Sequence, residues 1–137
     1  MRVFERILVP LDYSAASAAA LALVRKNFPA AGVRLLHVLD PGQLATAVTS
    51  PVTPDPEREA LEARARERLG PLATEADELI IRVGKPAEEI LKEAEEWHAD
   101  LIAMGTHGRT GFAHFLHGSV AEQVVRRSKL PVLIGHE

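Results

Sequence analysis

Five short apolar runs alternate along the chain with segments of helical periodicity, and this alternation constrains the fold more than any other feature. It is the pattern of repeated β–α–β units, in which a crossover helix makes successive strands run parallel. The runs that we interpret as strands are residues 6–10, 33–39, 78–83, 100–104 and 131–135. We therefore expect an α/β fold, with a doubly wound, five-stranded parallel sheet and helices on both faces.

The segments between these strands carry helix signals. The predicted helices are residues 15–27, 56–72, 86–98 and 119–128. Ser14 is placed to cap the first helix, and Pro86 stands at the first position of the third, where its missing N–H costs nothing. The second helix has an apolar stripe that is predicted to face the core. This stripe consists of Leu61, Ala65, Leu69 and Leu72.

Length and composition narrow the class of protein. A chain of 137 residues can bury one hydrophobic core, so we expect residues 1–137 to form one domain. The absence of cysteine excludes disulfides, thiol nucleophiles and thiolate metal sites. A net charge of -3 with dispersed basic residues argues against nucleic-acid binding, and no apolar run reaches the ~20 residues of a membrane span. The N-terminus lacks a secretory cleavage site, so the expected location is the cytoplasm.

Two segments fall where a doubly wound sheet binds its ligands, beyond the carboxyl ends of the strands at the reversal of the winding. They are "PLD", residues 10–12, after the first strand, and the glycine-rich residues 105–118 after the fourth. Four of the nine glycines lie in the second segment, and they would let the backbone fold closely around a polyanion. Gly118 and Ser119 then open a helix whose N–H groups favour phosphate, and Arg109 can donate to phosphate oxygens.

The same residues also have explanations that need no ligand. "SVAE", residues 119–122, fits a capping box in which Ser119 and Glu122 satisfy each other's backbone donors. Gly105 can serve as a turn after the fourth strand, and Asp12 as a turn residue that hydrogen-bonds the backbone. The sequence contains neither the P-loop motif G-x-x-x-x-G-K-(S/T) nor the Rossmann dinucleotide-binding motif G-x-G-x-x-G. Phosphate binding and a structural loop both stay open, although the place of Asp12 at the reversal favours ligand contact.

The spacing G-x2-G-x9-G-(S/T), formed by Gly105, Gly108, Gly118 and Ser119, resembles the nucleotide-binding signature of the ATP-binding universal stress proteins. The resemblance extends along the whole chain, through "ILVPLDYS", "LLHVLD", "VGKPAEEI", "ADLIAMGTHGRTG" and "KLPVLI". It implies the strand order 3-2-1-4-5, a fold like that of the adenine nucleotide alpha-hydrolases, and a homodimer formed through the last strand.

The resemblance also implies a site for ATP, which Mg²⁺ can accompany without dedicated carboxylate ligands. Pro10, Leu11 and Asp12 would line the adenosine pocket, and the backbone of Val38 would recognise adenine. The residues implied at the ribose and the phosphates are Met104, Gly105, Gly108, Gly118, Ser119 and Val120.

The histidines fit hydrogen-bonded or surface roles better than they fit a metal site. His114 and His117 would share a helical face, but no nearby Cys, Asp or Glu completes a ligand set. His107 is placed to reach the phosphates, and His37 is expected to be a partly buried strand residue. No convincing set of residues for ATP hydrolysis is evident, because Asp12 is placed for the nucleoside end of the ligand.

Two functional classes remain open on these observations. The first is a nucleotide-responsive regulatory module for stress response, with at most slow ATP hydrolysis. The second is a dimeric interaction protein of the same fold that binds no nucleotide, while an enzyme acting on adenine nucleotides comes third. Independently of the resemblance, the apolar last strand "PVLIG" predicts a dimer, because an exposed strand edge is a template for pairing unless the chain's own tail shields it.

Overall fold

The central sheet has five parallel strands in the order β3-β2-β1-β4-β5, as expected. This computed structural model describes residues 4–41, 56–106 and 119–136. The strands are β1 (Arg6–Pro10), β2 (Gly32–Leu39), β3 (Glu78–Val83), β4 (Leu101–Thr106) and β5 (Val132–His136). The chain runs outward from β1 to β3 and then crosses to β4 and β5, so the winding reverses between β1 and β4.

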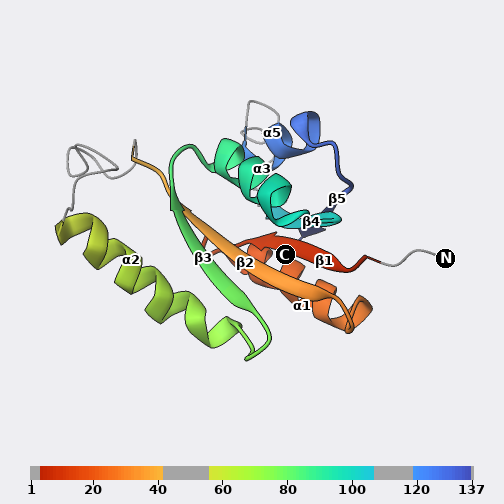
Figure 1. Cartoon of the computed structure of the whole chain (residues 1–137), viewed down its shortest axis with the longest axis horizontal. Coiled ribbons are helices and arrows are strands. Elements are labelled where there is room, and N and C mark those ends of the chain that lie inside the picture. The colour runs from red at the N-terminus through yellow and green to blue at the C-terminus, as the bar shows by residue number, and fades with distance from the viewer. Residues whose placement is uncertain (1–3, 42–55, 107–118, 137) are drawn as a thin grey trace.

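Helices cover both faces of this sheet (Figure 1). The helices α1 (Ala15–Asn27) and α2 (Pro56–Leu69) contribute to the core on one face. The helices α3 (Pro86–Trp97) and α5 (Val120–Arg127) cover the other face. Within the described ranges, no helix is both long enough and apolar enough to cross a membrane.

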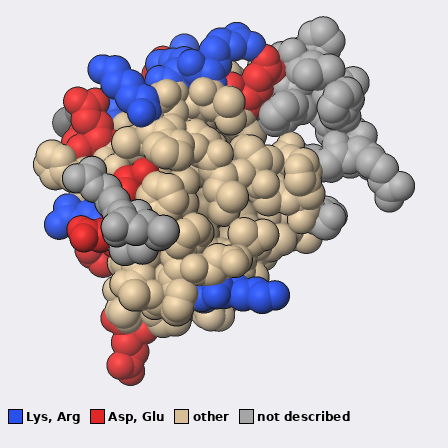
Figure 2. Space-filling model, turned by 90° about the vertical axis from the view of Figure 1, so that its right-hand side faces the viewer, with Lys and Arg blue, Asp and Glu red and all other residues tan. Residues whose placement is uncertain are grey.

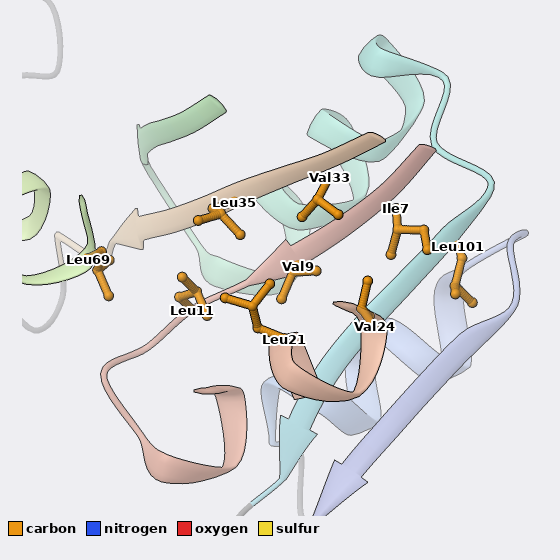
Figure 3. Close-up of a cluster of buried hydrophobic side chains, with 10 residues drawn as sticks. Ile7, Val9, Leu11, Leu21, Val24, Val33, Leu35, Leu69 and Leu101 are labelled. Atoms are coloured by element: carbon orange, nitrogen blue, oxygen red, sulfur yellow. The ribbon is translucent and has the colours of Figure 1, made fainter. Parts of the chain in front are cut away.

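Two hydrophobic cores lie on the two faces of the sheet. On the first face, Ile7 and Val9 of β1 pack with Leu21 and Val24 of α1 (Figure 3). The core on the second face consists of Leu8, Leu36, Ala87, Ile90, Ala94, Ala99, Ile102, Met104, Ala121 and Val124. Residues 7–9 are buried on both faces of the sheet, so β1 has no solvent-exposed face. This is why β1 appears in the sequence as a continuous apolar run.

The apolar stripe predicted for the second helix is only partly correct. Ala65 and Leu69 are buried and Leu61 is half-buried. Leu72 is 38% exposed, because α2 ends at Leu69 and a 3-10 turn, η1 (Gly70–Leu72), follows it. Pro71 lacks an N–H and disfavours an α-helical residue before it, so the α-helical stripe cannot continue to residue 72.

Gly105 lies inside β4, which corrects the prediction of a glycine-rich loop that begins at this residue. It pairs in register with Gly135 of β5. A Cβ atom at position 105 would lie 2.2 Å from the carbonyl carbon of Ala16. The first turn of α1 therefore passes too close to β4 for any side chain, and close approach of backbone is the reason for glycine here.

An ion-pair network that the sequence analysis did not predict ties α3 to the two strands beneath it. The Nη1 atoms of Arg34 and Arg82 each lie 2.8 Å from a carboxylate oxygen of Glu93. Arg82 Nε lies 2.8 Å from Glu89, and both glutamates are buried. Burial alone would lower the pKa of Arg82, but hydrogen bonds to Glu93 and Glu89 outweigh it and raise that pKa.

Charged side chains surround an uncharged centre on the face drawn in Figure 2. Lys and Arg on this face are interspersed with Asp and Glu around its rim. A nucleic-acid footprint requires basic side chains gathered on one surface. The described residues on this face do not form such a surface.

We predict that Gly105→Ala destabilises the fold by roughly 1–3 kcal/mol or more, because the new Cβ meets backbone that has no room to yield. Gly70→Ala is the matched control, since nothing lies within 4 Å of a Cβ there. It should change the free energy of unfolding by less than about 1 kcal/mol. Urea unfolding measures both variants, and equal stabilities for the two would contradict this account of Gly105.

Asp77 joins the turn before β3 to α1. Its Oδ2 accepts hydrogen bonds from Arg25 Nη2 and from the backbone N–H of Thr74, both at 2.8 Å. The side chain is only 4% exposed. Burial has the largest single influence and raises its pKa, but the hydrogen bonds from Arg25 and Thr74 together outweigh it and lower the pKa below 3.8.

A carboxyl group with a lowered pKa stabilises the fold above its unfolded-state pKa, and this contribution is lost as the pH falls through its folded-state pKa. Asp77→Asn should therefore be less stable than the wild type at pH 7, with a difference that shrinks at pH values below 3.8. Urea unfolding at pH 7 and pH 3 measures the difference, with the exposed neighbour Glu75→Gln as control. A difference that is the same at both pH values would count against an ionised Asp77 in the fold.

Candidate functional site

A cavity of about 760 Å³ opens where the winding of the sheet reverses. Its floor is formed by the carboxyl ends of β1, β2 and β4, and its walls by residues of α1, α2, α3 and α5. This is the place at which doubly wound sheets bind their ligands. The volume is in the range of about 300–1,000 Å³ that is usual for small-molecule sites.

Eight of the twelve predicted site residues line this one cavity, although they come from β1, the turn after β1, β2, β4 and the start of α5. They are Pro10, Leu11, Asp12, Val38, Met104, Gly105, Ser119 and Val120. The other four, His107, Gly108, Arg109 and Gly118, lie outside the described residues, as do His114 and His117. The reversal of the winding thus brings the "PLD" segment, the end of β4 and the start of α5 together.

The start of α5 forms the wall of the cavity beside β4. Ser119 is the N-cap, and its Oγ accepts a hydrogen bond of 3.1 Å from the backbone N–H of Glu122. The ligand-independent capping role expected for Ser119 is therefore present. The N–H groups of Val120 and Ala121 find no acceptor within the helix, and both residues line the cavity. This wall offers positive helix dipole and N–H donors to an anion.

Asp12 lies in the turn between β1 and α1, at the edge of the cavity. Its Oδ1 accepts hydrogen bonds from the backbone N–H of Ser14, at 3.0 Å, and from the Ser14 hydroxyl. Ser14 in turn caps α1, because its Oγ accepts from the Ser17 N–H. The turn role expected for Asp12 is thus realised, and the same residue lines the cavity.

His37 is one of the buried polar residues that line the cavity. As expected it is a buried strand residue, with 8% of its surface exposed. Its Nδ1 lies 2.7 Å from the carbonyl oxygen of Leu11. Because a carbonyl can only accept, the hydrogen bond puts the proton on Nδ1. The bond fixes the end of β2 against the chain that leaves β1.

Sequence analysis missed the contribution of α2 to the cavity. Leu61, Arg64 and Arg68 line it, and Arg68 also lies over the ring of Tyr13, with Cζ 3.8 Å from the ring centroid. Helical periodicity identified the apolar stripe of α2 but gave no position for α2 relative to the strand ends. The order of the elements was the available signal, since α2 directly follows the segment that leaves β2.

No group of three or more His, Cys, Asp or Glu side chains suited to a metal ion occurs among residues 4–41, 56–106 and 119–136. The carboxylates that line the cavity are Asp12 and Asp40. The described walls therefore present apolar contact, backbone hydrogen-bonding groups, these two carboxylates, hydroxyl groups, the His37 ring, and the guanidinium groups of Arg64 and Arg68.

Fold and cavity together define the class of this protein, a doubly wound α/β protein with its candidate ligand site at the reversal of the winding. Comparison with known sequences makes this more specific, because the model of the universal stress protein family matches residues 4–136. The chain belongs to the universal stress protein family, which confirms the resemblance seen in its motifs.

Individual relatives match over nearly the whole chain. Universal stress protein MJ0577 of Methanocaldococcus jannaschii is 33% identical over 153 residues, which cover 96% of this chain and 94% of that protein. The solved structure of MJ0577 has a TM-score of 0.76 at 32% identity, covering 97% of this chain and 96% of that one. A universal stress protein solved in complex with cAMP has a TM-score of 0.68 at 26% identity, covering 98% of each chain.

Proposed function

We propose that this chain binds an adenine nucleotide, ATP, in the cavity and acts as a nucleotide-responsive module in stress response. One observation carries the proposal: residues from the ends of β1, β2 and β4 and from the start of α5 line a single cavity of about 760 Å³. The cAMP complex of a related universal stress protein supports the choice of an adenine nucleotide.

Each wall has a role in this proposal. Pro10, Leu11 and Asp12 enclose the adenosine, and the backbone of Val38 hydrogen-bonds the adenine edge. The ribose lies against Met104 and the backbone of Gly105 at the end of β4.

The phosphates lie at the start of α5 in this proposal. The N–H groups of Val120 and Ala121 donate to phosphate oxygens, which the positive end of the helix dipole also attracts. The remaining phosphate contacts come from His107, Gly108, Arg109 and Gly118, with Mg²⁺ accompanying ATP. The proposal takes residues 1–137 as one universal stress protein domain that works in the cytoplasm.

Binding with at most slow hydrolysis fits the position of Asp12, one of the two carboxylates that line the cavity. Hydrolysis of ATP needs a group that orients the attacking water beside the γ-phosphate. Asp12 already accepts two hydrogen bonds from Ser14 and lies at the end of β1, away from the start of α5 in the proposed pose. It therefore serves the nucleoside and the turn, and not the γ-phosphate.

A second candidate function is a dimeric interaction protein that binds no nucleotide. Two observations favour it: Gly105 is required by the close approach of α1, and Ser119 caps α5, so neither residue needs a ligand to explain it. The two candidates differ in whether ATP stabilises the fold. ATP at about one hundred times its dissociation constant should raise the free energy of unfolding by about 2.7 kcal/mol in the first and by nothing in the second.

We predict that Ser119→Asp leaves the fold intact and weakens ATP binding by about tenfold or more. Asp caps helices about as well as Ser, so the free energy of unfolding should change by less than about 0.5 kcal/mol. The added negative charge at the start of α5, however, repels phosphate. Calorimetric titration with ATP measures affinity, and thermal unfolding without ligand measures stability.

Ser119→Asn is the matched control, because Asn caps equally well and has the size of Asp without its charge. It should bind ATP within about threefold of the wild type, a difference of less than about 0.7 kcal/mol. Equal ATP affinities for the Asp and Asn variants would refute a phosphate site at the start of α5. A wild type that binds none of ATP, ADP, AMP and cAMP would favour the second candidate function.

We also infer a homodimer formed through β5. Among the described strands, β5 pairs only with β4, so its other edge is open to a second chain. Leu133 and Ile134 are half-buried and would become more buried there. Sedimentation at micromolar concentration should give twice the mass of the chain, and a monomer would rule the dimer out.

A further inference from the structure

Tyr13 occupies the turn between β1 and α1 in a backbone conformation that is unusual for its residue type. Its φ is 72°, in the left-handed region that glycine and asparagine adopt more readily than an aromatic residue. The residue is 38% exposed and lines the cavity. A tyrosine keeps such a backbone only where its surroundings hold it there.

The ring of Tyr13 is held from two sides by residues far apart in the sequence. The ring of His37 lies 4.7 Å away between centroids, with an angle of 42° between the planes. The guanidinium of Arg68, on α2, lies over the ring at 3.8 Å from Cζ to the centroid. We call these three residues the Tyr13 stack. It reaches from the buried end of β2, through the turn after β1, to α2.

The residues just before Tyr13 in the chain, Leu11 and Asp12, are among those proposed to enclose the adenosine. The carbonyl of Leu11 accepts from His37 Nδ1 at 2.7 Å, and Asp12 accepts from Ser14 on the other side of Tyr13. Because the backbone at Tyr13 sets the direction of the chain between Asp12 and Ser14, the stack also sets the position of Asp12 at the cavity edge. Loss of the ring contacts leaves that turn free to take other conformations.

We propose that Tyr13 is a positioning residue for the nucleotide, clamped by Arg68 and His37 so that Leu11 and Asp12 are held in their binding positions. The clamp makes α2 part of the binding site through its contact with the ring. This inference rests on the proposed binding of an adenine nucleotide, and its first test needs no nucleotide.

The first test detects the clamp directly. Tyr13 is the one tyrosine of the chain, so ¹³C-labelled tyrosine gives a single set of ring signals in the NMR spectrum. Arg68→Gln should shift these signals, because the guanidinium above the ring is removed. Arg66→Gln is the matched control: it removes the same charge from the same helix, but the Arg66 guanidinium donates to the Leu79 carbonyl and is not among the groups that line the cavity.

The second test measures the dissociation constant for ATP alongside the stability without ligand. Tyr13→Phe retains the ring and should bind ATP within about threefold of the wild type. Tyr13→Asn tolerates the left-handed backbone but removes the ring, and it should bind about tenfold more weakly while still unfolding cooperatively. Arg68→Lys keeps the charge without the flat guanidinium, and it should bind about as weakly as Arg68→Gln.

The outcomes separate the two proposals. Ring signals that Arg68→Gln leaves unchanged overturn the clamp. If the ring signals shift but Arg68→Gln and Tyr13→Asn both bind ATP as the wild type does, the positioning role of Tyr13 is overturned. If Arg68→Lys binds ATP as the wild type does, the positioning role is also overturned, because only the charge of Arg68 would then matter. Failure of the wild type to bind any adenine nucleotide overturns the proposed function and the positioning role with it, whatever the ring signals show.

Discussion

The close approach of α1 to the sheet is the constraint on which the rest of this structure depends. Ala16 and Ala20 of α1 are fully buried against two glycines, Gly105 of β4 and Gly135 of β5, which are partners in the sheet register. A Cβ at Gly135 would lie 3.1 Å from the Cα of Ala20, and one at Gly105 would overlap the backbone of Ala16. Small residues on both surfaces therefore bring the start of α1 down onto the ends of β4 and β5.

This packing determines where the cavity lies. Because α1 is held against β4, the turn between β1 and α1 is fixed next to β4, across the point where the winding reverses. The "PLD" segment and the end of β4 then face the same space, and the start of α5 closes it. Gly105 and Ser119, two residues of the glycine spacing that resembles a nucleotide-binding signature, thus have structural roles before any ligand is considered. Such residues can identify a family even where they do not touch the ligand.

The parts of the structure that local patterns encode could be predicted from the sequence. Strands β1 and β3 have the predicted ends, and the caps at Ser14 and Ser119 form as expected, because periodicity and capping depend on neighbours within a few residues. The resemblance to a known family supplied the strand order, which is confirmed, and the twelve candidate site residues, which stay a prediction. Eight of these residues line the cavity, although they were named from the sequence without any distances.

The features that could not be predicted depend on contacts between distant segments. Arg34 and Glu93 are 59 positions apart, so only the register of β2 and β3 under α3 brings their charges together. The role of Gly105 depends on α1, which lies some 90 residues earlier in the chain, and a glycine after an apolar run is read from sequence alone as a turn. The stack of Arg68 on Tyr13 likewise required the position of α2, which periodicity does not give.

The walls of the cavity are held in place by different interactions, and this difference bears on how the protein could respond to a ligand. Helix α1 is fixed by glycine–alanine packing, and α3 by buried ion pairs from Arg82 to Glu89 and Glu93. Helix α2 buries only Ala65 and Leu69, and it lines the cavity with Leu61, Arg64 and Arg68, the last of which lies over the ring of Tyr13.

A wall held by a few contacts opens at a lower free-energy cost than one held by a packed core or an ion-pair network. In the proposed function, a ligand that contacts the turn around Tyr13 would act on α2 through the contact of Arg68 with the Tyr13 ring. In the proposed function, a change in the position of α2 would be one way in which an occupied cavity is signalled to a partner. The rigid side of the site would then recognise the ligand, and the side with few contacts would transmit its presence.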